Sequence, residues 1–465
     1  MAKYAMFTLQ NYLKLKQCTK CNSNLVRYYC SASKQSEHYD IVISGGGMIG
    51  STLACTLGKN TKLSNKRILL LESGKPIKWT AKEKYSNRVS ALNQNTYNLL
   101  SQIGAWKHIS AVRSAPVQDM QVWDAISDAV ITFNRDTSSK VVAHIVENGL
   151  LLDAIAKELS QLTNVHIRNE VKINKYSFPQ TSAQEVTIEL ENGEVFTCNL
   201  LLGCDGFNSQ VRQSMGVTFV SWKYDQKAIV ATLKFSEPVK NVTAWQRFLP
   251  TGPIALLPLS ENYSSLVWCT SPDLADYTLK LNEEQFVNEV NEALWKVYTS
   301  NSIIEESTKT FNKFLEWFQL PTSNRQQLPP KIVEVDKESI ASFPLGFGHA
   351  TRYIAEGVVL VGDAAHRVHP LAGQGVNLGF GDVATLNELL GEAAYSGREL
   401  GHISDLREYE TRRQRHNVPT MIAIDGLHKL YNTDFLPVVL LRSFGLQFTN
   451  AINPLKMAFI DHAGK

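Results

Sequence analysis

The sequence is poor in cysteine, and its few cysteines follow no pattern. There are seven, an odd number without the spacing of a disulfide framework. This argues against a small disulfide-stapled secreted fold and favours a reducing compartment. Cys18 and Cys21 form a C-x-x-C pair, but no second pair accompanies it, so neither a zinc nor a redox role is expected there. We predict no metal site.

Long apolar runs and an excess of one charge are also missing. Runs such as residues 435–441 are far shorter than the roughly 20 residues that span a bilayer, so we expect no transmembrane helix. The net charge is +3, but the first 36 residues hold six basic side chains and no acid. The remainder has 41 basic and 44 acidic residues. We therefore expect no nucleic-acid partner.

The acid-free segment 1–36 reads as a targeting sequence. It mixes lysine and arginine with tyrosine, leucine and phenylalanine, the composition of a mitochondrial transit peptide. A secretory signal needs a compact apolar core, and Lys14 and Lys16 interrupt any such core here. The alternative is a disordered cytosolic tail.

The first strong motif follows this segment. Residues 39–44 form a short apolar, β-branched run, and a G-x-G-x-x-G of Gly45, Gly47 and Gly50 comes directly after it. A small-residue helical run and a second apolar run, residues 67–71, follow in order. This succession predicts a βαβ unit that binds a dinucleotide. The alternative, a purely structural glycine turn, explains the succession less well.

Each motif position has a physical task. Gly45 permits the tight turn, Gly47 lets backbone approach a pyrophosphate, and Gly50 brings helix against sheet. The amides at the helix start, where Met48 and Ile49 also lie, would bind the phosphates with the help of the helix dipole. Glu72, at the end of the second run, is placed to accept hydrogen bonds from the adenosine ribose.

Two later motifs narrow the ligand. The buried run 200–204 ends in Asp205 and Gly206, where a turn opens a helix. Another apolar run, residues 357–361, leads into Asp363 and then into a proline- and glycine-containing loop, residues 369–377. In these residues the chain resembles the FAD-dependent aromatic-ring monooxygenases of the para-hydroxybenzoate hydroxylase fold, above all the branch that hydroxylates ubiquinone precursors. The resemblance covers residues 38 to about 430.

The resemblance assigns roles to these loops. It implies that Asp363 hydrogen-bonds the ribityl chain of FAD, although a helix N-cap is the alternative. It implies that Pro370, Gly373, Gly375 and Asn377 lie beside the isoalloxazine ring, where backbone amides and a positive helix end favour reduced flavin.

The resemblance covers five further residues. Asp205 and Gly206 match the turn behind the pyrophosphate, and Arg212 is expected to fix that turn. Arg88 resembles an arginine that reaches the FAD phosphates, although a surface salt bridge is the alternative. His366 follows the motif but is not expected to be catalytic.

The implied fold class is α/β, with a Rossmann-like FAD-binding domain, a discontinuous substrate domain built on a mixed β-sheet, and a helical carboxyl-terminal region. Helical patterns at 90–103 and 150–162 and strand alternation at 117–122 and 228–235 accord with it. The expected boundaries are 1–36 for the transit peptide; 38–112, 146–212 and 345–430 for the FAD domain; 113–145 and 213–344 for the substrate domain, with a surface insertion at 305–331; and 431–465 for the helical end.

One strand resembles the family strand that lines the aromatic substrate. It supplies the pocket candidates Arg247, Phe248, Leu256 and Pro258, whose alternative is an ordinary place in the core. The activity implied is hydroxylation of the aromatic ring of a polyprenylated 4-hydroxybenzoate-type precursor in ubiquinone biosynthesis, by dioxygen through a flavin C4a-hydroperoxide. No residue of the chain stands out as a catalytic acid or base.

Two other functions stay open. The same FAD frame serves isoprenoid reductases and epoxidases, and a flavin-bearing subunit could scaffold a biosynthetic complex without turnover. Anaerobic turnover and the oxygen-18 content of the product separate these from a monooxygenase.

The resemblance also implies partners and a location. Only one phosphate-cradling G-x-G-x-x-G is present, and the mitochondrial branch is expected to take electrons from ferredoxin and ferredoxin reductase. Arg412, Arg413, Arg415 and His416 form the densest basic cluster outside segment 1–36, a candidate dock for an acidic ferredoxin or else an ordinary helix face. Other ubiquinone-biosynthesis proteins and peripheral contact of residues 426–459 with the matrix face of the inner membrane are expected as well; the alternative is that these residues only close the FAD domain.

Overall fold

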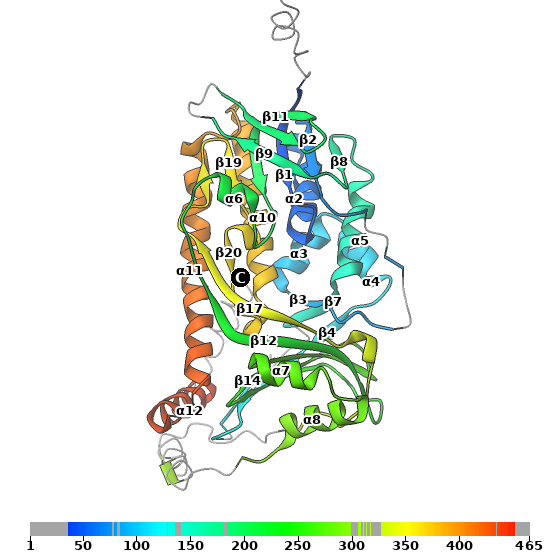
Figure 1. Ribbon diagram of the computed structural model, residues 1–465, viewed down its shortest axis with the longest axis vertical. Helices are drawn as coiled ribbons and strands as arrows, with labels where there is room; N and C mark the ends of the chain where they lie inside the picture. The colour runs from blue at the N-terminus through cyan, green and yellow to red at the C-terminus, as the bar shows by residue number, and fades with distance from the viewer. Residues whose placement is uncertain are drawn as a thin grey trace, which may run out of the picture.

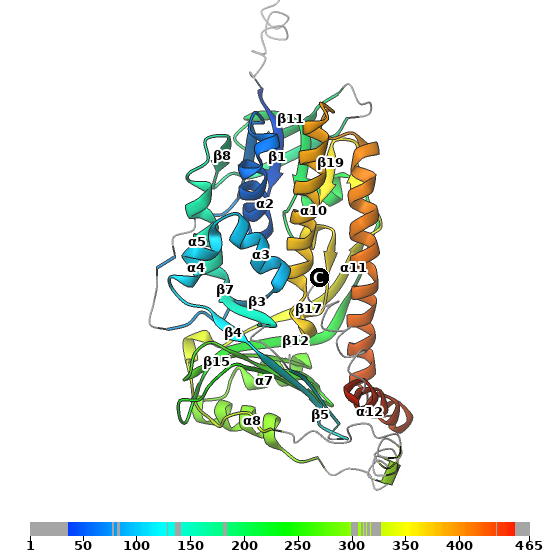
Figure 2. The same ribbon diagram turned by 180° about the vertical axis from the view of Figure 1, so that it is seen from behind.

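The computed structural model describes residues 36–451 except 77–78, 81–83, 128, 135–140, 180–183, 434 and most of 299–326. The transit-peptide prediction and most of the predicted insertion lie outside these residues. In the described part, two large sheets form two layers, one above the other in Figure 1, and a long helix runs along one side of both. Figure 2 shows the same arrangement from behind.

The upper layer contains an eight-stranded sheet among the described residues. Its central strands pair in parallel and are almost entirely buried, because their continuous runs of isoleucine, leucine and valine are covered on both faces. The strands in spatial order are β18 (Ile354–Ala355), β19 (Val358–Leu360), β11 (Val195–Gly203), β1 (Glu37–Ser44), β2 (Ile68–Leu71) and β8 (Val165–Arg168), with β10 (Val186–Leu190) and β9 (Ile173–Ser177) beyond β11.

Helices cover this sheet. The buried helix α2 (Met48–Lys59) packs between α5 (Asn148–Leu159) and α10 (Gly375–Tyr395). Its small residues, such as Ala54 and Thr52, allow this close approach. The remaining elements of this layer are η2 (Thr61–Leu63), α3 (Gln94–Gln102), α4 (Ala105–Ser110), α6 (Gln210–Ser214), η4 (Gly362–Ala364) and η5 (Pro370–Ala372).

A small three-stranded sheet lies between the layers. It consists of β3 (Val89–Asn93), β7 (Ala143–Glu147) and β4 (Ala115–Val117). The predicted helix 90–103 is therefore wrong in its first residues, which form β3. The helix begins only after Asn93, whose side chain accepts a hydrogen bond from the Thr96 amide and acts as its N-cap.

The lower layer is a nine-stranded sheet with helices on its outer face (Figure 1). Its longest strand, β12, pairs with strands on both sides. The strands in spatial order are β20 (His366–Arg367), β17 (Ala341–Ala350), β12 (Phe219–Phe235), β15 (Tyr263–Thr270), β14 (Gly252–Pro258), β13 (Thr243–Leu249), β5 (Asp119–Asp124) and β6 (Val130–Asn134), with β16 (Ile332–Val335) beside β12. The outer helices are α7 (Pro272–Thr278) and α8 (Glu283–Trp295), and η3 (Lys337–Ser339) lies near β12.

Helix α11 (Ile403–Tyr431) spans both layers and leads to α12 (Leu436–Ala451). The buried Arg442 of α12 pairs with the equally buried Asp124 of β5 at 3.0 Å and donates to the carbonyls of Leu430 and Thr433. This pair fastens α12 to the sheet. Across the described residues, no helix has the length and apolar character that crossing a membrane would require.

Candidate active site

Three loops begin side by side at one edge of the upper sheet. The parallel strands β1, β11 and β19 are in register where they end, with Ser44 opposite Gly203 and Gly203 opposite Leu360. The loops after these strands carry the three sequence motifs. Because carboxyl ends of parallel strands meet at one edge, motifs about 160 residues apart in the chain lie together there.

The first loop is a turn in which glycines allow close approach. Gly45 has φ +102°, and a Cβ there would lie 2.5 Å from the carbonyl oxygen of Cys204. A Cβ on Gly50 would lie 1.9 Å from the oxygen of Gly45, and one on Gly46 would meet the Glu72 side chain at 2.9 Å. Gly46, which was not among the predicted motif glycines, is therefore confined as well, by a side chain where Gly45 and Gly50 are confined by backbone.

Gly47 differs from its neighbours. It is exposed, has ordinary extended backbone angles and caps the start of α2, and nothing in the structure lies within 4 Å of a Cβ built there. The first amides of α2 have no partners within the helix, and no side chain caps it. The turn thus presents free amides and a positive helix end to open space.

Glu72 is held in place at the end of β2. One of its oxygens accepts a hydrogen bond from the Gly46 amide at 2.5 Å, and the other accepts from the Gly74 amide at 2.6 Å. The oxygen that binds Gly74 also accepts from the Ser73 hydroxyl at 3.3 Å. The carboxylate is therefore rigidly oriented beside the glycine turn, and the oxygen that binds Gly46 keeps a lone pair for a further donor.

The second loop carries a buried acceptor. Asp205 Oδ2 accepts from the amide of Val211 at 3.1 Å, while Oδ1 is buried without a hydrogen-bond partner among the described residues. Arg212 donates to the carbonyls of Phe207 and Ala364. The prediction that Arg212 fixes this turn is confirmed, and it also ties the second loop to the third.

The third loop presents a carboxylate. Asp363 lies within η4, whose N-cap is Val361, so Asp363 is not the N-cap that the alternative required. Its carboxylate makes no hydrogen bond within the described residues, and solvent reaches it at the mouth of the site. Although the residue is exposed, the protein atoms packed around its carboxyl displace water and raise the pKa of that group, and the nearby His366 and Arg367 partly oppose the rise.

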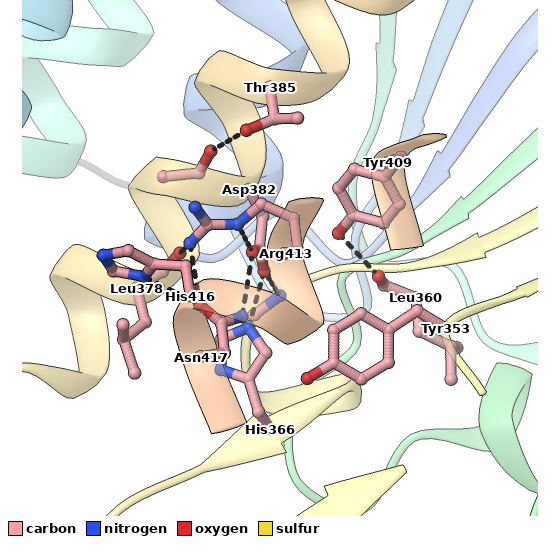
Figure 3. A network of polar contacts seen from close by, with 12 residues as sticks. Tyr353, Leu360, His366, Leu378, Asp382, Thr385, Tyr409, Arg413, His416 and Asn417 are labelled. Carbon is pink, nitrogen blue, oxygen red and sulfur yellow. Dashed lines mark hydrogen bonds and ion pairs between the residues drawn. The ribbon is translucent and has the colours of Figure 1, made fainter. Parts of the chain in front are cut away.

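A buried ion pair supports this loop from behind (Figure 3). Asp382 of α10 accepts from the Gly362 amide at 2.9 Å, from His366 at 2.7 Å and from Arg413 at 2.7 Å. Burial alone would raise the pKa of Asp382, but His366 and Arg413 hold it well below its ordinary value. His366 thus positions the loop through Asp382. Asp382 escaped the sequence analysis, although an isolated acid in an apolar helix is a signal for a buried pair.

The fourth loop joins η5 to α10. Gly373 has φ +59°, and α10 begins at Gly375. The Asn377 side chain donates to the carbonyls of Ala91 and Gly373 and accepts from the Asn93 amide and the Thr96 hydroxyl. These four bonds use its full hydrogen-bonding capacity, so the side chain braces the loop and only backbone at this position can face a ligand.

Comparison with known proteins agrees with this geometry. The family model described as "FAD binding domain" matches residues 38–317 and 315–421. The mitochondrial ubiquinone biosynthesis monooxygenase COQ6 of Danio rerio is 47% identical over 442 residues, which cover 94% of this chain and 91% of that protein. The Homo sapiens protein of the same name is 46% identical and covers 92% of both chains.

The chain belongs to the COQ6 family. It is therefore an FAD-dependent monooxygenase of mitochondrial ubiquinone biosynthesis. Among solved structures, p-nitrophenol 4-monooxygenase PnpA from Pseudomonas putida matches with a TM-score of 0.65 at 18% identity, over 92% of this chain and 99% of PnpA. OxyS anhydrotetracycline hydroxylase from Streptomyces rimosus matches with a TM-score of 0.61 at 20% identity, over 92% of this chain and 76% of that chain. These two likenesses support the predicted fold class.

The residues of this chain fit FAD. Open space lies over the start of α2 at Gly47. Asp205 has a buried oxygen without a partner among the described residues, and Asp363 offers an exposed carboxylate. An elongated ligand with phosphates and sugar hydroxyls supplies the charges and donors that these groups lack.

Arg88, the candidate for contact with the FAD phosphates, lies beside the small sheet. It is exposed, immediately before β3, and its guanidinium makes no ion pair or hydrogen bond within the described residues. The alternative of a surface salt bridge therefore finds no support there.

The four substrate-pocket candidates of this chain point in two directions. Arg247 donates to the carbonyls of Ala293 and Lys296 at the end of α8, and Leu256 packs in the cluster under the same helix. Pro258 lies on the Leu256 face by strand alternation. The structure therefore does not bring these three side chains to the face of the sheet that packs against η5 and α11. Phe248 faces the other way, stacked on Tyr431 with 3.8 Å between ring centroids.

The predicted basic cluster is dispersed. Arg413 is buried against Asp382, and Arg412 pairs with Glu388 and Glu408. Arg415 is exposed and pairs with none of the described residues. Consecutive helical residues point in directions about 100° apart, so these side chains do not share one face. The arrangement of Arg412 and Arg413 accords with the alternative, an ordinary helix face with contacts to the FAD domain.

Proposed function

We propose that this enzyme hydroxylates the aromatic ring of a polyprenylated 4-hydroxybenzoate-type precursor. The observation that carries the proposal is a continuous apolar cluster between the lower sheet and α10, α11 and α12. It begins at Leu371 of η5, continues past Phe248 and Tyr431, and reaches Leu446 of α12. We call the segment from His369 to Gly375 the flavin loop. Such a layer suits a ring held at the flavin with an isoprenoid tail that leads away from it.

We propose the cofactor sites as well, and the geometry above supports them. In the proposal, the FAD phosphates lie on the amides of residues 47–50, with Glu72 at the adenosine ribose and Asp363 at the ribityl chain. Asp205 and Gly206 lie behind the pyrophosphate, and Arg88 reaches the phosphates. Bound FAD supplies the activation of dioxygen, and the chain contributes orientation, exclusion of water and an unreactive apolar wall.

The precursor that accumulates without the enzyme tests the proposal. Cells lacking this protein should accumulate a polyprenylated ring that lacks one hydroxyl, as measured by mass spectrometry. Purified enzyme should place oxygen-18 from labelled dioxygen in the product. A precursor altered only in its isoprenoid chain would support the reductase or epoxidase instead, and full ubiquinone levels restored by a flavin-free variant would support the scaffold.

We also propose that α12 contacts the matrix face of the inner membrane. Phe435 and Leu441 are 62% and 67% exposed, and Leu427 at the end of α11 is 41% exposed. Apolar side chains at such a position suit an interfacial contact. Replacing Phe435 and Leu441 with serine should reduce flotation with cardiolipin-containing liposomes. The control is Tyr395→Ser at the distant end of α10, an 80% exposed aromatic; equal flotation of both variants would exclude α12.

The electrons come, in our proposal, from ferredoxin and ferredoxin reductase, and other ubiquinone-biosynthesis proteins are partners. The described residues contain one dinucleotide cradle, and FAD occupies it in the proposal. Because Arg412 and Arg413 are engaged in ion pairs, the proposal does not depend on docking at the 412–416 segment.

A further inference from the structure

A polar cluster is buried inside the apolar layer, and the functions described above do not use it. It consists of Tyr224 and Gln226 of β12, His369 before η5, and Asp425 and His428 of α11. The ring centroids of the two histidines are 4.8 Å apart, and the Tyr224 ring lies 4.5 Å from that of His428. Three separate elements thus bring two imidazoles together beside the flavin loop.

The hydrogen bonds determine which ring nitrogens carry protons. The amide group of Gln226 donates to the carbonyl of Thr251, so its oxygen faces the histidines and accepts from both, at 3.0 Å from His428 and 3.3 Å from His369. Each imidazole therefore donates through Nε2. His369 Nδ1 accepts from the Leu371 amide at 3.1 Å. The remaining nitrogen, His428 Nδ1, is then an acceptor.

His428 Nδ1 has no partner. The atom is buried, the residue is 8% exposed, and no donor within the described residues reaches it. A buried acceptor without a donor is unfavourable, so such an atom in a satisfied network indicates a donor from outside the chain. His428 lines a narrow hollow together with Phe248, Leu371 and Tyr431. The lining is mostly apolar and aromatic, with Gln226 and Asn432 as further polar members, and it suits an aromatic ligand that carries one donor.

We propose that His428 accepts the hydrogen bond and then the proton of the substrate's phenolic hydroxyl, an inference that rests on the proposed function. In this step the phenolic O–H bond breaks and an N–H bond forms at His428 Nδ1. The electron pair stays on the phenolate oxygen and enriches the ring for attack on oxygen. The side-chain oxygen of Gln226 accepts a hydrogen bond from the Nε2–H group of His428 before and after the transfer.

The charges around His428 suit this role. Asp425 accepts from the Tyr224 hydroxyl at 2.8 Å and pairs with Lys429 at 2.8 Å. Burial lowers the pKa of His428, and the Asp425 charge partly opposes that shift. Burial lowers the pKa of His369 to about 3, so His369 stays neutral near pH 7. His428 is then neutral before the transfer and has a carboxylate nearby to balance its charge afterwards.

The test uses the FAD-loaded enzyme without electron donor and 4-nitrophenol, whose ionisation is visible by absorbance. With wild type, the bound phenol should ionise at lower pH than the free phenol. His428→Asn keeps an acceptor near the position of Nδ1 but cannot take a proton. It should bind the phenol within about threefold of wild type and lose the shift in ionisation. In a separate turnover assay with the electron donor supplied, it should hydroxylate only at higher pH.

His428→Leu removes the acceptor and should weaken binding roughly threefold to tenfold. His402→Asn, at the far end of the same helix, is the matched control and should behave as wild type. Flavin content and unfolding midpoint show that each variant is folded, and the asparagine variant decides alone if the leucine variant is not. Wild-type ionisation and pH profile in His428→Asn would overturn the inference. Absence of ring hydroxylation by wild type would instead overturn the proposed function.

Discussion

Gly47 offers a test that separates cofactor binding from folding. A Cβ at this position meets no atom within 4 Å, and the backbone angles, φ −66° and ψ −173°, are open to any residue. A side chain there is therefore accommodated by the protein itself. It occupies the space from which a phosphate would reach the helix amides. We predict that Gly47→Val leaves the apoprotein folded and prevents normal FAD binding.

The magnitudes can be worked out for each state. In the apoprotein, losing a glycine at compatible angles stabilises by about 0.4–1 kcal/mol, whereas losing glycine as N-cap costs a similar amount. The two nearly cancel. In the complex, a displaced phosphate loses charge-assisted bonds worth about 1.5–3 kcal/mol. FAD affinity should therefore fall roughly tenfold to 150-fold.

Gly50→Ala is the matched comparison. Its Cβ would lie 1.9 Å from the Gly45 oxygen, so the turn itself must move, at a cost of about 1–3 kcal/mol to the fold. Urea unfolding of the apoproteins and FAD titration followed by flavin fluorescence measure both quantities. The expected pattern is affinity loss alone for Gly47→Val and loss of both for Gly50→Ala. Wild-type FAD affinity in Gly47→Val would refute the placement of the phosphates.

Three further predictions concern neighbouring features. Asp363→Ala should weaken FAD binding by about 1.5–3 kcal/mol because it removes a charge-assisted bond; full flavin content after gel filtration at limiting FAD would contradict it. Arg413→Ala should lower stability in urea by about 3–5 kcal/mol because Asp382 is left buried without its partner, while Arg412→Ala should leave the midpoint near that of wild type. In stopped-flow experiments, NADPH alone should reduce the flavin slowly and NADPH with ferredoxin reductase and ferredoxin quickly, with a steep dependence on salt; fast, salt-independent reduction by NADPH alone would exclude that electron source.

The turns at the sheet edge were predictable from sequence because backbone geometry dictates them. Gly45 and Gly50 are required by close contacts of main-chain atoms, and such contacts leave a spacing that can be read directly. Asp363 could be placed for a similar reason, since a strand and a short turn precede it. The loops therefore carried their structure in local sequence.

The orientation of the substrate strand could not be read in the same way. Strand β13 is buried along almost its whole length on both faces, so its apolar residues show no alternation that tells inside from outside. Arg247 faces α8 and Phe248 faces the flavin side only because of which layers cover each face. That information lies in distant segments of the chain.

The buried polar residues of helix α11 could not be predicted from the sequence for a related reason. Its buried stripe, spaced by three and four residues, includes Arg413, Asn417, Asp425 and His428. Buried polar side chains disturb the apolar periodicity by which a helix face is recognised. Their partners, Asp382 and Gln226, lie on other elements, so single residues of the stripe looked like surface charges.

Side-chain hydrogen bonds hold the segment between Asp363 and the first turn of α10 in place. His366 bonds to Asp382 of α10, His369 bonds to Gln226 of the lower sheet, and Asn377 bonds to Ala91 and Asn93 at β3. Successive side chains thus anchor the loop to the upper layer, the lower layer and the small sheet between them. A loop held from three directions keeps its backbone amides and Pro370 in fixed positions, which is the requirement for presenting a flavin to a ring bound in the other layer. In the proposed complex, the backbone of this loop orients FAD relative to a ring in the other layer, while His366, His369 and Asn377 hold the loop in place.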